Sequence, residues 1–478
     1  MDFATPVAQP KMLIVIGAYF IAIAVLVYIT KRKQNRESVK DFALAGKNLS
    51  AFLLMATFMA SWMGGGAVAG SIASISYSNG LWPSICYGSS SLAAIVILFL
   101  LGPIVRKRGK VTTAALIEDR FGTNARVISA VIIALASFSI VSYQLRALGI
   151  VLNATTGLSI NISTVIACVI IIIGTMSGGL NSVVRIDGFS VCIMLAGLGI
   201  ALPYILNLVG GWQWVVERTA QVNPQGLTFT GGWTVKNYLA NYMPGFLLAL
   251  GDQNLYQRMA AAKTDKNIQI GMIGWFLGTI VVLPAVSIMA YVGRMYFGSN
   301  IIPSQGMISL STICPWWIGG LMMAACCGFI ITTGNSYLLS GSTNVATDVY
   351  QHFKKNASEA QVVKVIRTSV VVFGLFALGI LQFFPSILAI QYWASTIVGA
   401  GITPSLLACV VCPNKVTKAG GLASMIGGTL LTIGWEACGQ PFGLNTVLVA
   451  FPASVLLLVV VSMITKKNTP GSAPVANA

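Results

Sequence analysis

Apolar stretches of about 20 residues recur from one end of this chain to the other, and they constrain its fold more than any other feature. A helix of that length crosses the ~30 Å hydrocarbon core of a bilayer. Only 9% of the 478 residues are charged and the mean hydropathy is +0.82, whereas a soluble protein has roughly 25% charged residues. The sequence therefore predicts an all-α, polytopic membrane protein with a single transmembrane domain over 1–467 and a disordered cytoplasmic tail over 468–478.

We expect about thirteen membrane-spanning helices, because that many stretches are long and apolar enough. They are 11–30, 50–76, 80–105, 125–154, 159–179, 185–209, 233–256, 267–293, 316–351, 363–382, 386–411, 418–435 and 443–465. The loops between them are short, so the sequence predicts no second domain.

The basic residues indicate how the chain is oriented. Most of the 29 Lys and Arg residues fall between alternate spans, and Lys and Arg prefer the cytoplasmic side. The N-terminus is therefore predicted outside and the C-terminus in the cytoplasm, as in a multi-pass protein of the cell membrane. Only Lys11, Arg218, Lys236 and Arg294 remain outside, and Arg146 lies within a span. The net charge of +17 thus reflects topology, and nucleic acid is not an expected partner.

Two spans contain residues that weaken a helix. The second contains Gly64–Gly66, and each glycine costs about 1 kcal/mol relative to alanine. The seventh contains Pro244, which removes a backbone donor, and further on Gly251–Asn254. These spans are five apart, and transporters with inverted five-helix repeats begin each repeat with an interrupted helix beside the substrate and ion. The spacing favours such repeats, over about 50–210 and 233–411, although the glycines could instead serve close packing.

Enzymatic and proton-relay chemistry find little support in this sequence. The only histidine, His352, is predicted at a cytoplasmic helix end, and the spans are nearly free of acidic residues. No HExxH, GxSxG or phosphate-binding motif occurs, and the nine cysteines form no CxxC pair. The sequence therefore predicts neither an enzyme nor a metal centre.

Hydroxyl and carbonyl oxygens remain as ligands, and they suit a hard monovalent cation such as sodium. Phe329, Thr332 and Thr333 are spaced i, i+3, i+4 and share one helix face. Their hydroxyls and carbonyl could bind an ion together. Alternatively, each hydroxyl bonds the carbonyl one turn back, as is common in membrane helices.

Four stretches of the chain stand out in the order Asp41–Lys47, Ser177–Leu180 with Asp187, Asp252–Arg258, and Thr332–Thr343 followed by Thr347–Tyr350. They resemble those of the sodium/solute symporter family, which includes the sodium/proline and sodium/galactose symporters. The resemblance covers nearly the whole chain. It implies a LeuT-like bundle of inverted five-helix repeats with one additional helix before the core and two after it.

The resemblance also implies a sodium site. It assigns the backbone carbonyls of Ala60, Met63 and Phe329 and the hydroxyls of Thr332 and Thr333 to the ion. Na+ would be the co-transported ion, and no organic cofactor is expected.

The resemblance does not identify the solute. Trp62 stands where the proline branch has a carboxylate, and Trp62 and Ala67 replace polar side chains of the sugar branch. Leu248 lies near the position of a sugar-gating tyrosine. Sugar is therefore disfavoured and proline is not supported. We expect Trp62, Gly65, Ala67 and Leu248 at the substrate site, with Trp62 as an apolar or stacking wall or, alternatively, as an interfacial packing residue.

Four charged residues are candidates for coupling or gating. Asp187 suits a helix N-terminus, and the resemblance implies a part in sodium release. Asp252 and Arg258 could pair across closing helices or serve as ordinary helix caps. Arg146 is predicted within the bilayer, where a charge is a functional candidate by default. It could meet a carboxylate of the substrate, or extend toward the outer surface.

These observations together favour electrogenic symport of sodium with a small organic solute by alternating access within the lipid bilayer. A proton-coupled or uncoupled carrier on the same fold is the alternative, and a channel or membrane sensor is a distant one. The sequence does not indicate an oligomeric state.

Overall fold

The chain is built of helices, as its apolar stretches predict. The computed structural model describes residues 3–31, 39–176 and 179–466. The tail 468–478, for which disorder is predicted, and the motif residues 177–178 lie outside the described residues. Within the described ranges no strand forms, and one isolated bridge joins Leu49 to Ala262. The fold is therefore all-α, as expected.

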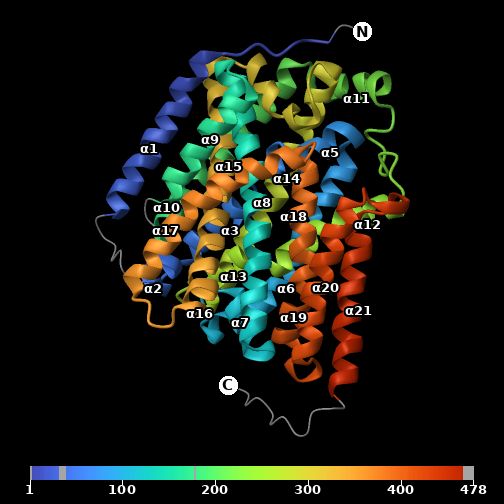
Figure 1. Cartoon of the computed structure of the whole chain (residues 1–478). Helices are drawn as coiled ribbons and strands as arrows, with labels where there is room; N and C mark the ends of the chain where they lie inside the picture. Colours follow the sequence, from blue (N-terminus) through green and yellow to red (C-terminus); the bar gives the residue numbers. More distant parts are fainter. Residues whose placement is uncertain (1–2, 32–38, 177–178, 467–478) are drawn as a thin grey trace.

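The helices follow one another along the chain, and the longest connections between them in the described ranges are 223–234 and 298–315 (Figure 1). Those of the N-terminal half are α1 (Leu13–Lys31), α2 (Val39–Leu44), α3 (Ala51–Trp62), α4 (Gly65–Val68), α5 (Ser71–Asn79), α6 (Leu81–Arg108), α7 (Thr113–Phe121), α8 (Thr123–Thr156), α9 (Ile160–Met176), α10 (Gly179–Leu208) and α11 (Gly211–Val222). Those of the C-terminal half are α12 (Val235–Gly251), α13 (Gln253–Ala260), α14 (Asp265–Phe297), α15 (Trp316–Asn344), α16 (Gln351–Phe353), α17 (Glu359–Ile380), α18 (Ile387–Gly401), α19 (Thr403–Val411), α20 (Lys418–Ala437) and α21 (Thr446–Lys466).

Judged by length and composition, fewer helices could cross a membrane than the sequence predicts. Within the described residues, nine helices are long and apolar enough to cross a membrane, or up to ten if the bent pair α3 and α4–α5 is one span. Expected spans at α9, α12–α13 and α20 form helices but fall outside that set. Helices α9 and α12 have only 17 residues each, and α20 carries Lys418 and Glu436 near its ends. The expected count of about thirteen is therefore not confirmed.

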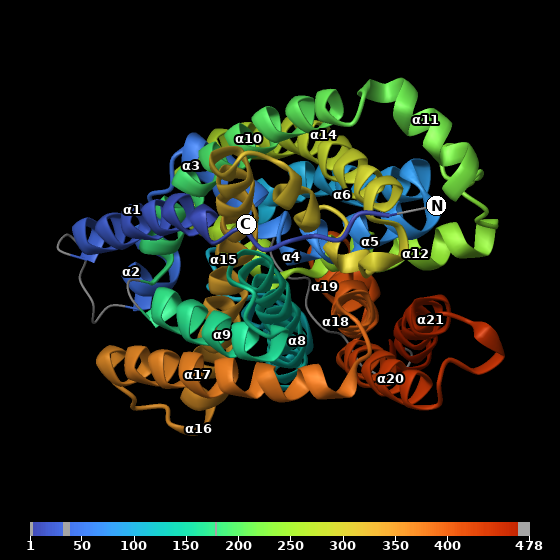
Figure 2. The same ribbon diagram turned by 90° about the horizontal axis from the view of Figure 1, so that it is seen from above.

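Helix α15 forms the centre of the bundle. Nearly all of its residues from Ile318 onward are buried, and α8 and α10 pack against it. Small residues allow this close packing: a Cβ on Gly197 of α10 would come within 2.7 Å of the Ala325 Cβ. Helix α1 lies at the periphery, and α20 and α21 pack on each other at the opposite edge, beside α18 (Figure 2). One helix before the core and two after it agree with the implied bundle.

Two helices are interrupted in mid-course. Helix α3 ends at Trp62 and the chain resumes as α4 and α5, with a bend of 47°. Helix α12 continues through Pro244, the first weak place that the sequence marks in this span, and ends at Gly251, the start of the second. Asp252 is extended (φ −72°, ψ 110°), and its carboxylate accepts the Asn254 N–H at 2.9 Å. A side-chain cap that begins α13, and not the proline, therefore sets the second interruption.

Candidate functional site

The break after α3 releases a backbone carbonyl from its own helix. Met63 has a non-helical ψ of 66°, and Gly64 is extended (φ −94°, ψ −156°). The Gly64 N–H donates to the Trp62 carbonyl at 3.0 Å, whereas an unbroken helix would use the Ala60 carbonyl, four residues earlier. Because Ala60 is fully buried, its carbonyl must find another partner.

The hydroxyls of two adjacent threonines of α15 meet that carbonyl. Thr332 Oγ1 lies 3.0 Å and Thr333 Oγ1 2.9 Å from the Ala60 oxygen. Thr333 Oγ1 also lies 2.9 Å from the Phe329 carbonyl, and Thr332 Oγ1 lies 2.6 Å from the Gly328 carbonyl. Each threonine hydroxyl therefore contacts both a carbonyl one turn back in α15 and the Ala60 carbonyl of α3. Each hydroxyl has one proton, so the two hydroxyls can donate only two hydrogen bonds to the three carbonyls of Ala60, Gly328 and Phe329. Because oxygen atoms outnumber the protons between them, this cluster suits a bare cation.

Met63, the fifth residue of the predicted sodium site, stands beside these four. The Ala67 N–H, which would bond the Met63 carbonyl in a regular helix, donates to the Gly64 carbonyl at 2.9 Å. Met63 and Thr333 line the same cavity. The structure thus brings all five predicted residues to one place, four of them through direct hydrogen bonds.

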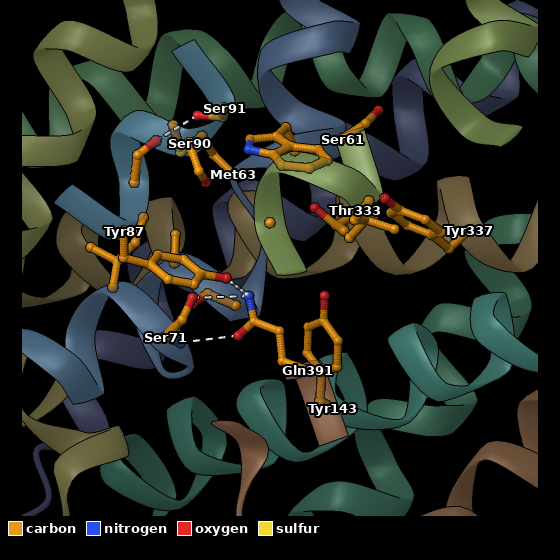
Figure 3. Close-up of a pocket in the computed structure, with 17 residues that line it drawn as sticks. Ser61, Met63, Ser71, Tyr87, Ser90, Ser91, Tyr143, Thr333, Tyr337 and Gln391 are labelled. Atoms are coloured by element: carbon orange, nitrogen blue, oxygen red, sulfur yellow. Dashed lines mark hydrogen bonds between the residues drawn. The ribbon is translucent and has the colours of Figure 1, made fainter. Parts of the chain in front are cut away.

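A central cavity of about 40 Å³ adjoins the oxygen cluster (Figure 3). Three of the predicted substrate residues, Trp62, Ala67 and Leu248, line it. The lining, as far as the structure describes the chain, contains no charged side chain. Its other polar groups belong to Ser61, Ser71, Ser90, Ser91, Tyr87, Tyr143, Tyr337 and Gln391. The cavity therefore offers hydroxyls, an amide and aromatic faces.

Gly65, the fourth predicted substrate residue, lies against α8 and is not part of the cavity wall. Its N–H donates to Gln144 Oε1 at 2.6 Å, and a Cβ there would come within 2.6 Å of the Ala147 Cβ. Gly66 does line the cavity, and a Cβ on it would meet Gln391 Nε2 at 2.6 Å. The glycines thus allow two buried glutamine side chains to approach the broken helix closely.

Gln391 of α18 joins the start of α5 to α6, and we call Gln391, Ser71 and Tyr87 the Gln391 bridge. The Ser71 N–H donates to Gln391 Oε1 at 3.0 Å. Gln391 Nε2 donates to Ser71 Oγ at 2.9 Å and to the Tyr87 hydroxyl at 3.2 Å (Figure 3). The second half of the broken helix is therefore held by neutral hydrogen bonds.

Arg258 of α13 holds the first half of the broken helix in a different way. Its Nε donates to Thr57 Oγ1 at 2.6 Å, its Nη2 to Ser336 Oγ at 2.7 Å, and its Nη1 to the Asn254 carbonyl at 3.0 Å. Asp187 Oδ2 lies 3.7 Å from Nη2 and accepts the Thr57 hydroxyl at 2.5 Å. These five buried residues, the Arg258 cluster, join α3, α10, α13 and α15.

Asp252 contacts α15 and not Arg258. Its Oδ2 accepts the Tyr337 hydroxyl at 2.6 Å, while the same carboxylate caps α13. Tyr337 follows Thr333 by one helical turn and lines the central cavity. In the described part of the chain, the ion pair of Arg258 is with Asp187. Asp252 therefore links the second interrupted helix to the helix that carries the threonines.

Arg146 belongs to neither the Gln391 bridge nor the Arg258 cluster. Its Nη1 donates to Asn161 Oδ1 at 3.1 Å, and it lines a second cavity of about 560 Å³ near the start of α9 and α18. Tyr143, three residues earlier on α8, lines the central cavity. Arg146 is thus close to the central cavity but is not part of it.

Most of the chain matches a known protein family. Residues 42–428 match the Sodium:solute symporter family. The chain belongs to this family. The osmoregulated proline transporter of Bacillus subtilis is 25% identical, over 97% of this chain and 96% of its own. The human high affinity choline transporter 1 is 23% identical over 92% and 79%, and the rabbit (Oryctolagus cuniculus) sodium/glucose cotransporter 1 is 24% identical over 95% and 78%.

Solved structures show the same fold. A Na+-coupled sialic acid symporter in an outward-open state superimposes with a TM-score of 0.80 at 16% identity, over 95% of this chain and 98% of the other. A nucleobase-cation-symport-1 transporter in a closed conformation gives 0.61 at 14% identity, over 90% and 95%. The predicted LeuT-like bundle is confirmed. As a family member, the protein is a sodium-coupled symporter of a small organic solute that works by alternating access.

The sequence-based prediction omits two buried glutamines of this symporter. Gln144 and Gln391 each contact the broken helix, and both belong to predicted spans. A signal was available, because a polar side chain inside a membrane span marks a site in the same way as a charge. What the sequence did not reveal is that both amides meet the glycine segment, since their contacts lie 79 and 320 residues away.

Proposed function

We propose that the co-transported sodium ion binds between α3 and α15, at the carbonyls of Ala60, Met63 and Phe329 and the hydroxyls of Thr332 and Thr333. One observation carries this proposal: two hydroxyls of α15 meet the carbonyl that the break in α3 releases. Sodium in this place takes the lone pairs of the hydroxyl oxygens. It therefore links the broken helix to the central helix of the bundle.

The solute binds in the central cavity, against Trp62, Ala67 and Leu248 and within reach of Gln391 and Tyr143. The lining suits a small solute with hydroxyl or amide groups and an apolar part. A cavity of about 40 Å³ holds about three waters. The walls must therefore separate before a solute fits, and the neutral Gln391 bridge is the part that opens.

Asp187, Asp252 and Arg258 couple ion release to helix movement. Ser336, which accepts a hydrogen bond from Arg258, follows Thr332 by four residues on α15. Thr57, which bonds both Arg258 and Asp187, precedes Ala60 by three residues on α3. The Arg258 cluster thus lies about one turn beyond the sodium ligands on both helices. A sodium ion that leaves in this direction passes the Asp187 carboxylate.

The test removes the two hydroxyls singly. Thr332→Ala and Thr333→Ala should each raise the sodium concentration for half-maximal thermal stabilisation of the purified protein about tenfold or more, which corresponds to ~1.4 kcal/mol of lost binding. Thr→Ser at either position keeps the oxygen and should bind sodium almost normally.

Thr343→Ala is the matched control, because Thr343 is a buried threonine of the same helix whose hydroxyl has no hydrogen-bond partner among the described residues. The proposed ion site is wrong if both alanine variants respond to sodium as the wild type and the Thr343 control do.

We also propose that the N-terminus lies outside and the C-terminus in the cytoplasm of the cell membrane, and that repeats over about 50–210 and 233–411 form the transport core. The distribution of Lys and Arg supports the orientation, and the two interrupted helices, one near the start of each repeat, support the repeats. A cysteine in the 220–230 loop should react with an impermeant maleimide in intact cells, and one near Lys354 should not. The opposite labelling pattern would reverse the orientation.

A further inference from the structure

The cavity that contains Arg146 is a vestibule of mixed lining between α5, α8, α9, the 302–304 loop and the start of α18. Its volume of about 560 Å³ is enough for a small organic molecule. The polar side chains on its wall are Arg146, Asn161, Ser74, Ser78, Ser304 and Ser386. We call it the Arg146 vestibule.

The Arg146 vestibule lies about one helical turn from the central cavity on three separate helices. On each helix, one residue lines the vestibule and another, three or four positions away, lines the central cavity. The pairs are Ser74 and Ser71 on α5, Arg146 and Tyr143 on α8, and Ile387 and Gln391 on α18. One turn is about 5.4 Å, so a solute that leaves the vestibule past the Gln391 bridge enters the central cavity directly.

Arg146 brings an uncompensated positive charge to this space. Its side chain donates to the neutral Asn161 amide oxygen, at 3.1 Å. In the described ranges no carboxylate lies within ion-pairing distance of Arg146. Arg294 and Arg218 also lack a carboxylate partner in the described ranges, but neither lines this cavity. Arg294 donates to two backbone carbonyls, and Arg218 donates to the Met295 carbonyl and lies over the Phe3 ring. Arg146 therefore has donors to spare for an anion.

We propose that the Arg146 vestibule is an outer binding site for the carboxylate of the transported solute, which occupies it before entering the central cavity. The proposal rests on the symport function proposed above and adds a substrate class, small carboxylates. A guanidinium binds a carboxylate through two parallel hydrogen bonds. A single positive charge in a concave site with partly apolar walls also raises the local concentration of anions. The lining of the central cavity has no charged side chain among the described residues, so this cavity receives the uncharged part of the solute.

The first arm of the test measures the local potential without knowledge of the solute. Ser304→Cys places a thiol on the vestibule wall, and its reaction rates with an anionic sulfonate methanethiosulfonate and a cationic ammonium one are compared at low ionic strength. The ratio of anionic to cationic rates should fall at least fivefold in Arg146→Gln and be largely retained in Arg146→Lys. Lys236→Gln removes an exposed positive charge that does not line the vestibule, and it should leave the ratio unchanged. An unchanged ratio in Arg146→Gln overturns the proposal.

The second arm uses matched competitors, from acetate to benzoate, with the corresponding amides and with chloride. Carboxylates should slow the labelling of the introduced thiol severalfold, the amides should not, and Arg146→Gln should abolish the difference. Equal protection by acid and amide, or by chloride at the same concentration, overturns a carboxylate site for the solute. Sodium-dependent thermal stabilisation is measured on the same variants. If it persists while the carboxylate effect is absent, the vestibule assignment fails and the sodium site stands.

Discussion

The central cavity of this symporter is closed on its two sides by different chemistry. On one side, the Arg258 cluster places a buried guanidinium in hydrogen bonds with two other helices, α3 and α15, and with its own helix α13, 3.7 Å from the Asp187 carboxylate of α10. On the other side, the Gln391 bridge consists of an amide and two hydroxyl-bearing side chains, all neutral. Beyond that bridge lies the Arg146 vestibule, which is already open to a volume of about 560 Å³.

This difference indicates which side opens more readily. A neutral hydrogen bond contributes about 1 kcal/mol net, and a solute hydroxyl or amide can replace each partner of Gln391. Opening the other side breaks the hydrogen bonds of the charged Arg258 side chain to Thr57 and Ser336, and a hydrogen bond to a charged group contributes about 1.5–3 kcal/mol. We propose that the structure is held more firmly at the Arg258 cluster than at the Gln391 bridge. In this proposal, sodium at its proposed site one turn away supplies the additional free energy that opening the Arg258 side requires.

The largest effect is expected at the Arg258 cluster. Arg258→Met leaves Asp187 buried without its cation and should destabilise the protein by about 3–5 kcal/mol, seen as a marked fall in melting temperature and loss of transport. Adding Asp187→Asn removes the uncompensated charge and should restore much of the melting temperature without restoring transport. An unchanged melting temperature in Arg258→Met would show that this side is not held by the ion pair.

A smaller effect is expected at the break itself. In Gly64→Ala, the new Cβ would lie 2.5 Å from Thr333 Oγ1 and 2.7 Å from Thr333 Cβ, so the hydroxyl must move away from the Ala60 carbonyl. The sodium concentration for half-maximal thermal stabilisation should rise about tenfold. Gly199→Ala, where the Cβ meets open space, is the control and should bind sodium normally. A wild-type sodium response in Gly64→Ala would show that sodium binding does not depend on the close contact between Gly64 and Thr333.

The smallest effect on stability is expected at the Gln391 bridge. Gln391→Ala removes three hydrogen bonds and leaves polar groups that a widened, hydrated cavity can satisfy, so the loss of stability should be about 1–3 kcal/mol. A cysteine introduced in place of Ser90, on the wall of the central cavity, should then react severalfold faster with a reagent that enters through the vestibule. Gln391→Glu keeps an acceptor for the Ser71 N–H and serves as the control. If Gln391→Ala lost more stability than Arg258→Met, the Gln391 bridge and not the Arg258 cluster would be the more firmly held side.

Several features of the fold and site follow from local sequence. The length of the apolar stretches predicts helices, and the i, i+3, i+4 spacing of Phe329, Thr332 and Thr333 puts one carbonyl and two hydroxyls on one face. The triple glycine correctly marks the break after Trp62, because three glycines weaken a helix wherever it packs. For the seventh span the sequence marked two places, Pro244 and Gly251–Asn254, and the break lies at the second. Pro244 is accommodated within α12, and the cap formed by Asp252 ends it seven residues beyond Pro244.

By itself, the sequence determined that this protein is an all-α membrane protein with a helix broken at its glycines and a pair of adjacent threonines on a buried face. Only the tertiary structure decided which polar groups meet. Thr333 reaches the Ala60 carbonyl across 273 residues, and Gln391 reaches Ser71 across 320. Helix formation depends on neighbours within a turn or two, whereas these contacts depend on how α3, α5, α15 and α18 pack. A buried polar group must find a partner, but local sequence does not specify which one.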